Sequence, residues 1–399
     1  MLDAPAETTK DAESFLALDQ AMRKEGAAFA LNQLITLLTE RGDARALLDA
    51  LLLRARHELG LPLLHAGPLN DVAEPLRSKY EEKYVDAIRT VGGRLLADGD
   101  IAGAWPYLRA IGEPELIAKA IDAYVAEEGD ERLNGLVEVA FNQGANPRKG
   151  FELILEHYGT CSAITAFEHL PQDEAVRTAC ADRLVRQLHT HLVSNLRAEI
   201  AQRGQPLSAH AVPIAELIRG RDWLFQEDAY HIDVSHLAAT VRVSPLLTDL
   251  STIALALELT DYGRQLSERF KYEGEPPFED TYEDHGVYLR CLLGQEVEQG
   301  VAHFRSKLAP PDQEDRDSIL PAQVLVGLLA RMNRLDEAIE VASTYLADLP
   351  ESALICPGLA ALCQRAGQPG KLAKIAQEHG NLVQYLASQL QSGPNNGQG

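Results

Sequence analysis

Residues 228–241, DAYHIDVSHLAATV, hold the densest group of side chains in this sequence that could do chemistry. His231, Asp233 and His236 lie close together here, next to Glu227. Two imidazoles and a carboxylate form a recognised ligand set for a transition metal. His231, Asp233 and His236 are also the candidates for a catalytic group.

The spacing of these residues favours a structural role. On one continuous helix, His231 would lie about 200° from Asp233 and about 140° from His236, so the three groups would not converge. They converge only if 231–233 are extended and a helix begins afterwards. Asp233 would then be its N-cap, accepting from the backbone N–H of Ser235 or His236. The alternative is a metal site in which Glu227, Asp228 or the acidic stretch 283–285 completes the set.

Other sequence patterns for chemistry are missing. We find no phosphate-binding GxxxxGK[ST] or GxGxxG loop, no GxSxG nucleophile elbow and no HExxH zinc motif. The acidic run 279–284 lacks the spacing and the glycine of a calcium-binding EF-hand, so we interpret the proline-rich segment 271–286 as a solvated loop. We therefore expect no cofactor and no bound metal, and a binding protein rather than an enzyme.

Composition restricts the class of partner and compartment. The chain has 399 residues and a formal net charge of −22, which disfavours nucleic acid and anionic membranes as partners. Its five cysteines form no CxxC pair, as suits a reducing compartment. The N-terminal residues carry no signal-peptide pattern, and no apolar run is long enough to span a membrane. We expect a cytoplasmic protein.

The chain is rich in Leu and Ala, and its apolar residues recur at helical spacing. Residues 322–350 show the arrangement most clearly: an apolar helix, the turn MNRLD, and a second helix that stops by Pro350. With its connection to the next hairpin this unit has a period of about 34 residues. Similar pairs of apolar segments flank turns at Gly42-Asp43 and at 144–146. The pattern predicts an all-α chain of antiparallel helical hairpins.

These hairpins resemble tetratricopeptide repeats. In 322–350, Ala338 matches the family's small residue in the second helix and Pro350 its closing proline, although Ala322 and Val326 replace other consensus residues. Further matches to the family's glycines and small alanine are Gly92, Gly99, Ala104 and Gly367. The resemblance implies an α-solenoid, a right-handed superhelix whose first helices line a concave, peptide-binding groove.

From this pattern we expect an N-terminal helical-repeat region at 1–204, an irregular central segment at 205–290, repeats at 291–390 and a disordered tail at 391–399. The expected function is a scaffold that binds a protein or peptide in the groove. The alternatives are a catalytic or metal-dependent protein that uses the histidine segment, and a helical oligomerisation module.

The resemblance also implies which residues face the groove. Some family members hold acidic C-terminal tails with a Lys/Asn clamp, but the asparagine position here is Thr90, Val324 or Gly358. We therefore expect no binding of the acidic tails of chaperones, and instead an apolar contact supported by arginines. The predicted groove residues are Arg89, Gln323, Arg331, Gln364 and Arg365.

Overall fold

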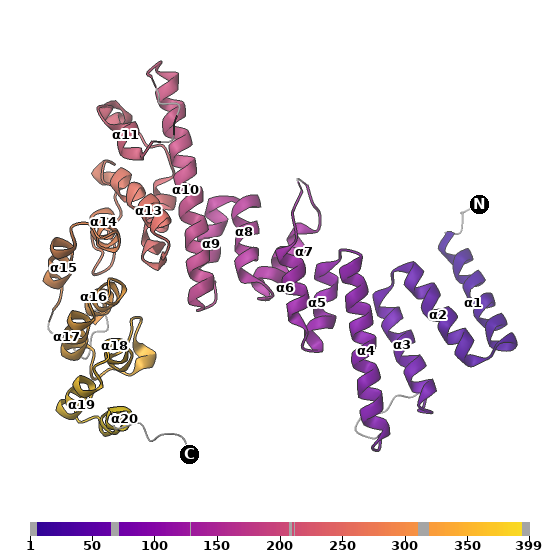
Figure 1. Cartoon of the computed structure of the whole chain (residues 1–399). Helices are drawn as coiled ribbons and strands as arrows, with labels where there is room; N and C mark the ends of the chain where they lie inside the picture. The colour runs from indigo at the N-terminus through magenta and orange to yellow at the C-terminus, as the bar shows by residue number, and fades with distance from the viewer. Residues whose placement is uncertain are drawn as a thin grey trace. The chain divides into compact units, whose positions relative to one another are not determined.

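The computed structural model describes residues 6–64, 72–127, 129–206, 210, 212–309 and 319–392. Helices are its regular elements (Figure 1), which confirms the prediction of an all-α chain. Within these ranges there is no β-strand, and one isolated bridge joins Glu273 to Asp280. No helix in the described ranges is both long and apolar enough to cross a bilayer.

The chain divides into two compact units, Met1–Leu153 and Ile154–Gly399, with the division inside one helix. In unit 1, helices that follow one another in the chain pack together, as α2 does on α3 and α4 on α5. The elements of unit 1 are α1 (Ala6–Lys24), α2 (Ala27–Arg41), α3 (Ala44–Glu58), α4 (Leu76–Ala97), α5 (Ile101–Ala110), α6 (Pro114–Asp122), α7 (Leu133–Val137), the π-helix η2 (Glu138–Asn142) and the first part of α8 (Pro147–His157).

Two hairpins of unit 1 turn at a Gly-Asp pair. Gly42 and Gly99 have φ of 71° and 80°, a left-handed conformation that glycine adopts without steric cost. Asp43 and Asp100 follow them as N-caps and accept hydrogen bonds from Ala46 N and Gly103 N. One residue pair therefore ends one helix and starts the next.

The core of unit 1 is apolar. On α5, Ile101, Ala104, Trp105 and Leu108 recur at helical spacing and are buried against side chains of α6, α7 and α8. Gly92 of α4 lies where a Cβ atom would fall 2.8 Å from Leu108 Cγ, so α4 and α5 approach closely at this glycine. The position that matches the family's glycine therefore has a packing role.

In unit 2, several elements pack on one long helix, and the later helices pack on their neighbours in the chain. Its elements are the rest of α8, α9 (Gly159–Glu168), α10 (Glu174–Gln202), α11 (Ile214–Ile218), η3 (Asp222–Asp228), α12 (Val234–Val243), η4 (Ser244–Leu246), α13 (Leu250–Gly263), η5 (Glu268–Phe270), α14 (Thr281–Leu292), α15 (Val297–Ser306), α16 (Leu320–Arg331), α17 (Leu335–Tyr345), η7 (Glu351–Ala353), α18 (Leu359–Arg365), α19 (Pro369–Glu378) and α20 (Leu382–Ser392).

Helix α10 organises the first part of unit 2. A buried row of apolar side chains, each four residues after the last, follows one side of the helix. Helices α9, α12 and α13 and the turn η4 pack on α10. The members of the row are Cys180, Leu184, Leu188, Leu192, Leu196 and Ile200.

The prediction that 271–286 is a solvated loop was wrong for its last six residues. Helix α14 begins at Thr281, with Asp280 as N-cap accepting from Tyr282 N and Glu283 N. Asp284 and His285 are buried. Acidic side chains stabilise the positive N-terminal end of a helix, so the composition that indicated a loop also suits a first helical turn.

The tail predicted as disordered, 391–399, overlaps the end of α20 at 391–392, and its remaining residues lie outside the described ranges. The segment 205–233 is irregular where it is described: it contains only α11 and the short η3 before α12 begins.

Candidate functional site

The backbone of the histidine segment meets the condition under which the side chains of His231, Asp233 and His236 could converge. Residues 231–233 are not helical, and α12 begins at Val234. Asp233 accepts hydrogen bonds from Ser235 N at 2.9 Å and His236 N at 3.2 Å, which confirms its predicted role as N-cap. Ser235 donates hydrogen bonds to Asp233, and the one from its hydroxyl does most to hold the pKa of Asp233 below its usual value.

His231 is held by Tyr262 of α13. The Tyr262 hydroxyl oxygen lies 3.0 Å from His231 Nδ1 and accepts the His231 backbone N–H at 2.8 Å. Burial raises the pKa of Tyr262, so its hydroxyl stays protonated, and we assign its proton to a hydrogen bond to Nδ1 because its oxygen already accepts from the backbone N–H. The neutral imidazole then carries its proton on Nε2. Burial also lowers the pKa of His231, so this neutral form predominates at neutral pH.

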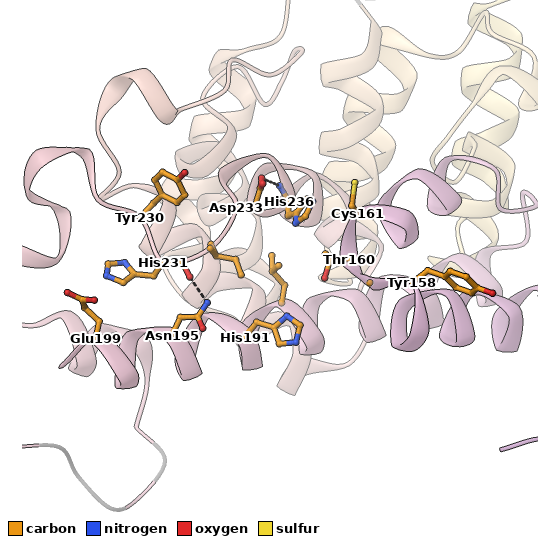
Figure 2. A pocket seen from close by; sticks show the side chains of 13 residues that line it. Tyr158, Thr160, Cys161, His191, Asn195, Glu199, Tyr230, His231, Asp233 and His236 are labelled. Carbon is orange, nitrogen blue, oxygen red and sulfur yellow. Dashed lines mark hydrogen bonds between the residues drawn. The ribbon is translucent and has the colours of Figure 1, made fainter. Parts of the chain in front are cut away.

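His231, Asp233 and His236 line an open cleft of about 640 Å³, called here the histidine cleft. Figure 2 shows His231 extending toward Glu199, while His236 points toward Thr160. The cleft lies between the start of α9, one face of α10 and the segment before α12. Its lining residues are Tyr158, Gly159, Thr160, Cys161, Leu188, His191, Asn195, Glu199, Tyr230, His231, Ile232, Asp233 and His236.

The structure brings His231 and His236 to one cleft but does not add Glu227 to its lining. Throughout the described ranges, no three His, Cys, Asp or Glu side chains are grouped so that they could hold a metal ion. The set of His231, His236 and Glu227 named as the metal alternative is therefore not assembled.

Three of the five predicted groove residues meet in unit 2. Gln323, Arg331 and Arg365 line one partly enclosed cavity of about 510 Å³, called here the Gly327 cavity. Its other lining residues are Glu174, Thr178, Pro245, Leu246, Thr248, Phe278, Tyr288, Val324, Gly327, Ala330, Ile355, Cys356 and Pro357. Arg89 belongs to unit 1, where it pairs with Asp86 and Glu113, and Gln364 is exposed outside this lining.

The polar groups of the Gly327 cavity have distinct partners. Gln323 is buried, and its Oε1 accepts from Ile355 N at 2.7 Å, which fixes the loop that forms one wall. Arg331 donates to the carbonyl oxygens of Pro245 and Leu247. Arg365 Nη2 donates to Ala330 O at 2.9 Å. Sequence reasoning placed these arginines near the groove but missed their carbonyl partners, which are distant in the chain.

The cavity contains no activated nucleophile. Burial raises the pKa of the Cys356 thiol to about 11, so it stays protonated and weakly nucleophilic at neutral pH. Burial also raises the pKa of Tyr288, although the Arg331 guanidinium opposes this.

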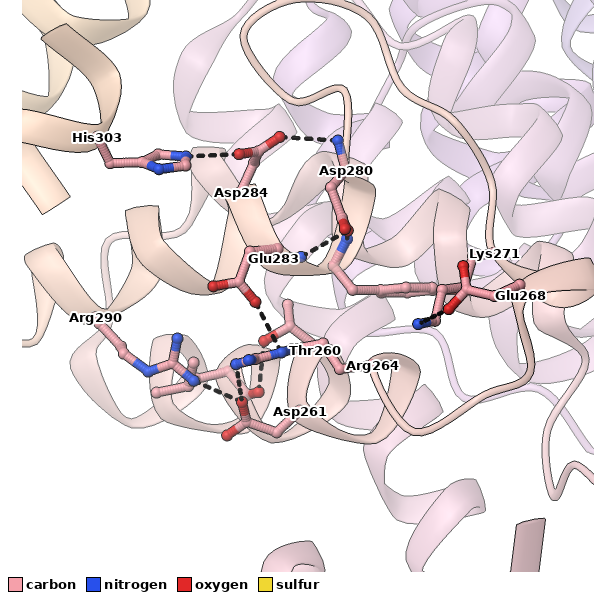
Figure 3. A network of polar contacts seen from close by, with 12 residues as sticks. Thr260, Asp261, Arg264, Glu268, Lys271, Asp280, Glu283, Asp284, Arg290 and His303 are labelled. Atoms are coloured by element: carbon pink, nitrogen blue, oxygen red, sulfur yellow. Dashed lines mark hydrogen bonds and ion pairs between the residues drawn. The ribbon is translucent and has the colours of Figure 1, made fainter. Parts of the chain in front are cut away.

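Polar contacts around the buried Asp284 hold the end of the segment 271–280, which includes the cavity residue Phe278 (Figure 3). Asp284 contacts His303 Nε2 at 2.6 Å and Lys307 Nζ at 2.8 Å, and accepts from Asp280 N at 2.9 Å. Burial disfavours the Lys307 ammonium, but its hydrogen bonds to Asp284 and Glu279 outweigh burial and raise its pKa. These contacts join the segment to α14 and α15, and their buried charges are paired.

Comparison of the chain with protein-family models, with curated proteins and with solved structures finds no match in any of the three. Arguments about function therefore rest on the residues of the two candidate sites.

Proposed function

We propose that the helical hairpins form a tetratricopeptide-like superhelix and that the protein is a non-enzymatic scaffold. It binds an extended segment of a partner protein in the Gly327 cavity. The proposal places this interaction in the cytoplasm, because the acidic charge and the cysteine usage of the sequence suit that compartment.

The observation that carries the proposal is the surroundings of Gly327. A glycine inside a helix costs about 1 kcal/mol relative to alanine. At Gly92 close packing explains the glycine, but a Cβ atom at Gly327 would meet only Cys356 Cβ, at 3.8 Å. Packing within the protein does not account for this residue. Gly93 and Gly370 have equally open surroundings, but Gly327 lines a cavity, so a ligand backbone that passes close to α16 would account for it.

The lining indicates what kind of segment fits. Most of the wall is apolar, from Pro245, Leu246, Phe278, Val324 and Ile355, and it favours aliphatic or aromatic side chains. The apolar side chains of such a segment would exclude water from the cavity on binding.

The two arginines have different roles in the proposal. Arg331 is engaged with two carbonyl groups and shapes the wall. Arg365 uses one amino group on Ala330 O, and its other N–H groups have no acceptor among the described residues, so it can pair with a carboxylate of the bound segment. We propose a segment that combines apolar residues with an Asp or Glu.

The test is selection of displayed random peptides on the purified full chain. We expect peptides with apolar residues and one acidic residue to be enriched. Gly327→Leu fills the cavity from its wall and should abolish the enrichment. Gly370→Leu is the matched control, because Gly370 is an exposed helical glycine with nothing within 4 Å of an added Cβ.

On the Arg365→Ala protein, peptides with apolar residues should still be enriched, but the preference for an acidic residue should be lost. If the same peptides are enriched on the Gly327→Leu protein, the cavity is not the binding site and the proposal fails.

A further inference from the structure

The histidine cleft is a second site, separate from the Gly327 cavity in its lining and its chemistry. No residue lines both. Its volume of about 640 Å³ lies within the range of roughly 300–1,000 Å³ that is usual for small-ligand sites. Unlike the cavity, it is open and rich in hydrogen-bonding side chains. We propose that the histidine cleft binds a neutral, polyhydroxylated ligand of the carbohydrate class.

The side chains of the cleft offer donors and acceptors together. We assign the proton of the neutral His231 to Nε2, because Nδ1 lies 3.0 Å from the Tyr262 hydroxyl, whose oxygen already accepts from the His231 backbone N–H. His191 Nε2 lies 3.2 Å from Gln187 Nε2, an amide nitrogen that donates, so the imidazole nitrogen is the acceptor in this contact. Asn195 donates from Nδ2 to His231 O, which leaves its Oδ1 as an acceptor. A hydroxyl group both donates and accepts, so a row of hydroxyls matches this mixture.

The charges of the cleft exclude strongly charged ligands. No Lys or Arg is among its lining residues, so a phosphate or sulfate would lack a permanently charged partner there. Its two carboxylates are already engaged: Asp233 caps α12, and Glu199 pairs with Arg203 at 3.4 Å. A cation would have to compete with these partners for the carboxylates, so a neutral ligand fits best.

Two tyrosines border the cleft with much of their surface in solvent. Tyr158 is 43% exposed and Tyr230 is 53% exposed. Figure 2 shows them at different ends of the group of lining side chains. An exposed aromatic ring presents an apolar surface on which the C–H face of a sugar ring can stack, while its hydroxyls reach polar neighbours.

The backbone before Tyr230 supports a functional role. Glu227 and Asp228 have φ of 56° and 61°, a left-handed conformation that is unfavourable for residues other than glycine. Consecutive strained residues persist where the surrounding structure holds them, and they are frequent at ligand sites. Here they form the end of η3, two residues before Tyr230 of the cleft.

The experiment measures binding of the full chain to an array of neutral malto-, cello-, manno- and N-acetylchito-oligosaccharides, with cationic chitosan and sulfated oligosaccharides alongside. We expect retention on at least one neutral series. Tyr158→Ala and Tyr230→Ala should each raise the Kd for that series roughly tenfold.

The controls separate stacking from folding. Tyr230→Phe keeps the ring, including its edge contact with Phe270 at 5.2 Å, and should bind within about twofold of the unaltered chain. Tyr84→Ala, at a tyrosine that is 42% exposed in α4, should change nothing. The proposal is overturned if no neutral series retains the chain better than the double variant Tyr158→Ala/Tyr230→Ala, or if only the charged oligosaccharides do.

Discussion

The buried residues of the two units differ in kind. Among the residues that the structure describes, unit 1 buries aliphatic and aromatic side chains and glycines, whereas unit 2 also buries polar and charged ones. The buried polar residues of unit 2 are Thr240, Ser244, Thr252, Thr260, Thr281, Asp284, His285, Gln323 and Ser388. Burying such groups is unfavourable unless each finds a partner, so they reduce the stability that the same volume of apolar core would give.

This difference coincides with where the two candidate sites lie, since both belong to unit 2. Gln323 fixes a wall of the Gly327 cavity, and Ser244, beside the cavity residue Pro245, has a buried hydroxyl with no hydrogen-bond partner in the described structure. Unit 1 is built for close packing of hairpins. In unit 2, buried polar groups instead hold a particular arrangement of side chains around a cavity.

The largest effect that would test this difference is expected when the pH is lowered. Burial lowers the pKa of His285 to about 4, with Arg242 adding to the shift while the Thr281 carbonyl and Asp284 oppose it. Between its unfolded pKa near 6.5 and about 4, the unfolded state binds a proton that the folded state does not. The stability of unit 2 should therefore fall by up to about 3 kcal/mol as the pH drops through this window.

The two tryptophans allow each unit to be followed separately. Trp223 reports on unit 2 in a Trp105→Phe chain, and Trp105 reports on unit 1 in a Trp223→Phe chain. In urea titrations, the Trp223 midpoint should fall between pH 6.5 and 4 more steeply than the Trp105 midpoint. His285→Phe should remove this extra slope, and an unchanged slope would show that another group is responsible.

A second prediction concerns close packing in unit 1. Gly92→Ala places a Cβ 2.8 Å from Leu108 Cγ, and Leu108 is fully buried. Overpacking should outweigh the gain in helix propensity and destabilise unit 1 by about 1–2 kcal/mol, measured by the Trp105 midpoint. Gly93→Ala is the matched control in the same helix, because nothing lies within 4 Å of its added Cβ. Equal midpoints for the two variants would contradict the close approach of α4 and α5.

The third prediction addresses the histidine cleft. Asp233→Ala removes the N-cap of α12 and should destabilise unit 2 by about 1 kcal/mol, seen in the Trp223 midpoint. Asp233→Asn can still accept a hydrogen bond and should recover most of the loss. If Asp233→Asn is as unstable as Asp233→Ala, the carboxylate charge matters more than the cap.

The smallest effect is expected at Gly327. Gly327→Ala replaces a helix-interior glycine where an added Cβ has room, so unit 2 should gain about 0.5–1 kcal/mol. The same substitution thus has opposite signs at Gly92 and Gly327. A loss of stability for Gly327→Ala would mean that this glycine serves packing after all, and the proposed role of the cavity would lose its support.

Sequence reasoning recovered what depends on near neighbours in the chain. Helical spacing predicted the pair α16 and α17, and the residue types at 233–236 predicted the cap at Asp233. It failed at 281–286, because acidic residues after two prolines fit both a loop and a first helical turn. It also missed the carbonyl partners of Arg331 and the bond between His231 and Tyr262, since no local pattern specifies a contact so far along the chain.

The contact of Arg331 with the turn η4 has a consequence for the order in which the chain matures. The carbonyl groups of Pro245 and Leu247 receive their donor from a residue 86 and 84 positions later. During synthesis, the α4–α5 hairpin can close as soon as it has emerged, because its contacts are local. The carbonyl groups of η4 lack this donor until α16 has been made, so unit 2 should become fully protease-resistant on nascent chains only after Arg331 has left the ribosome.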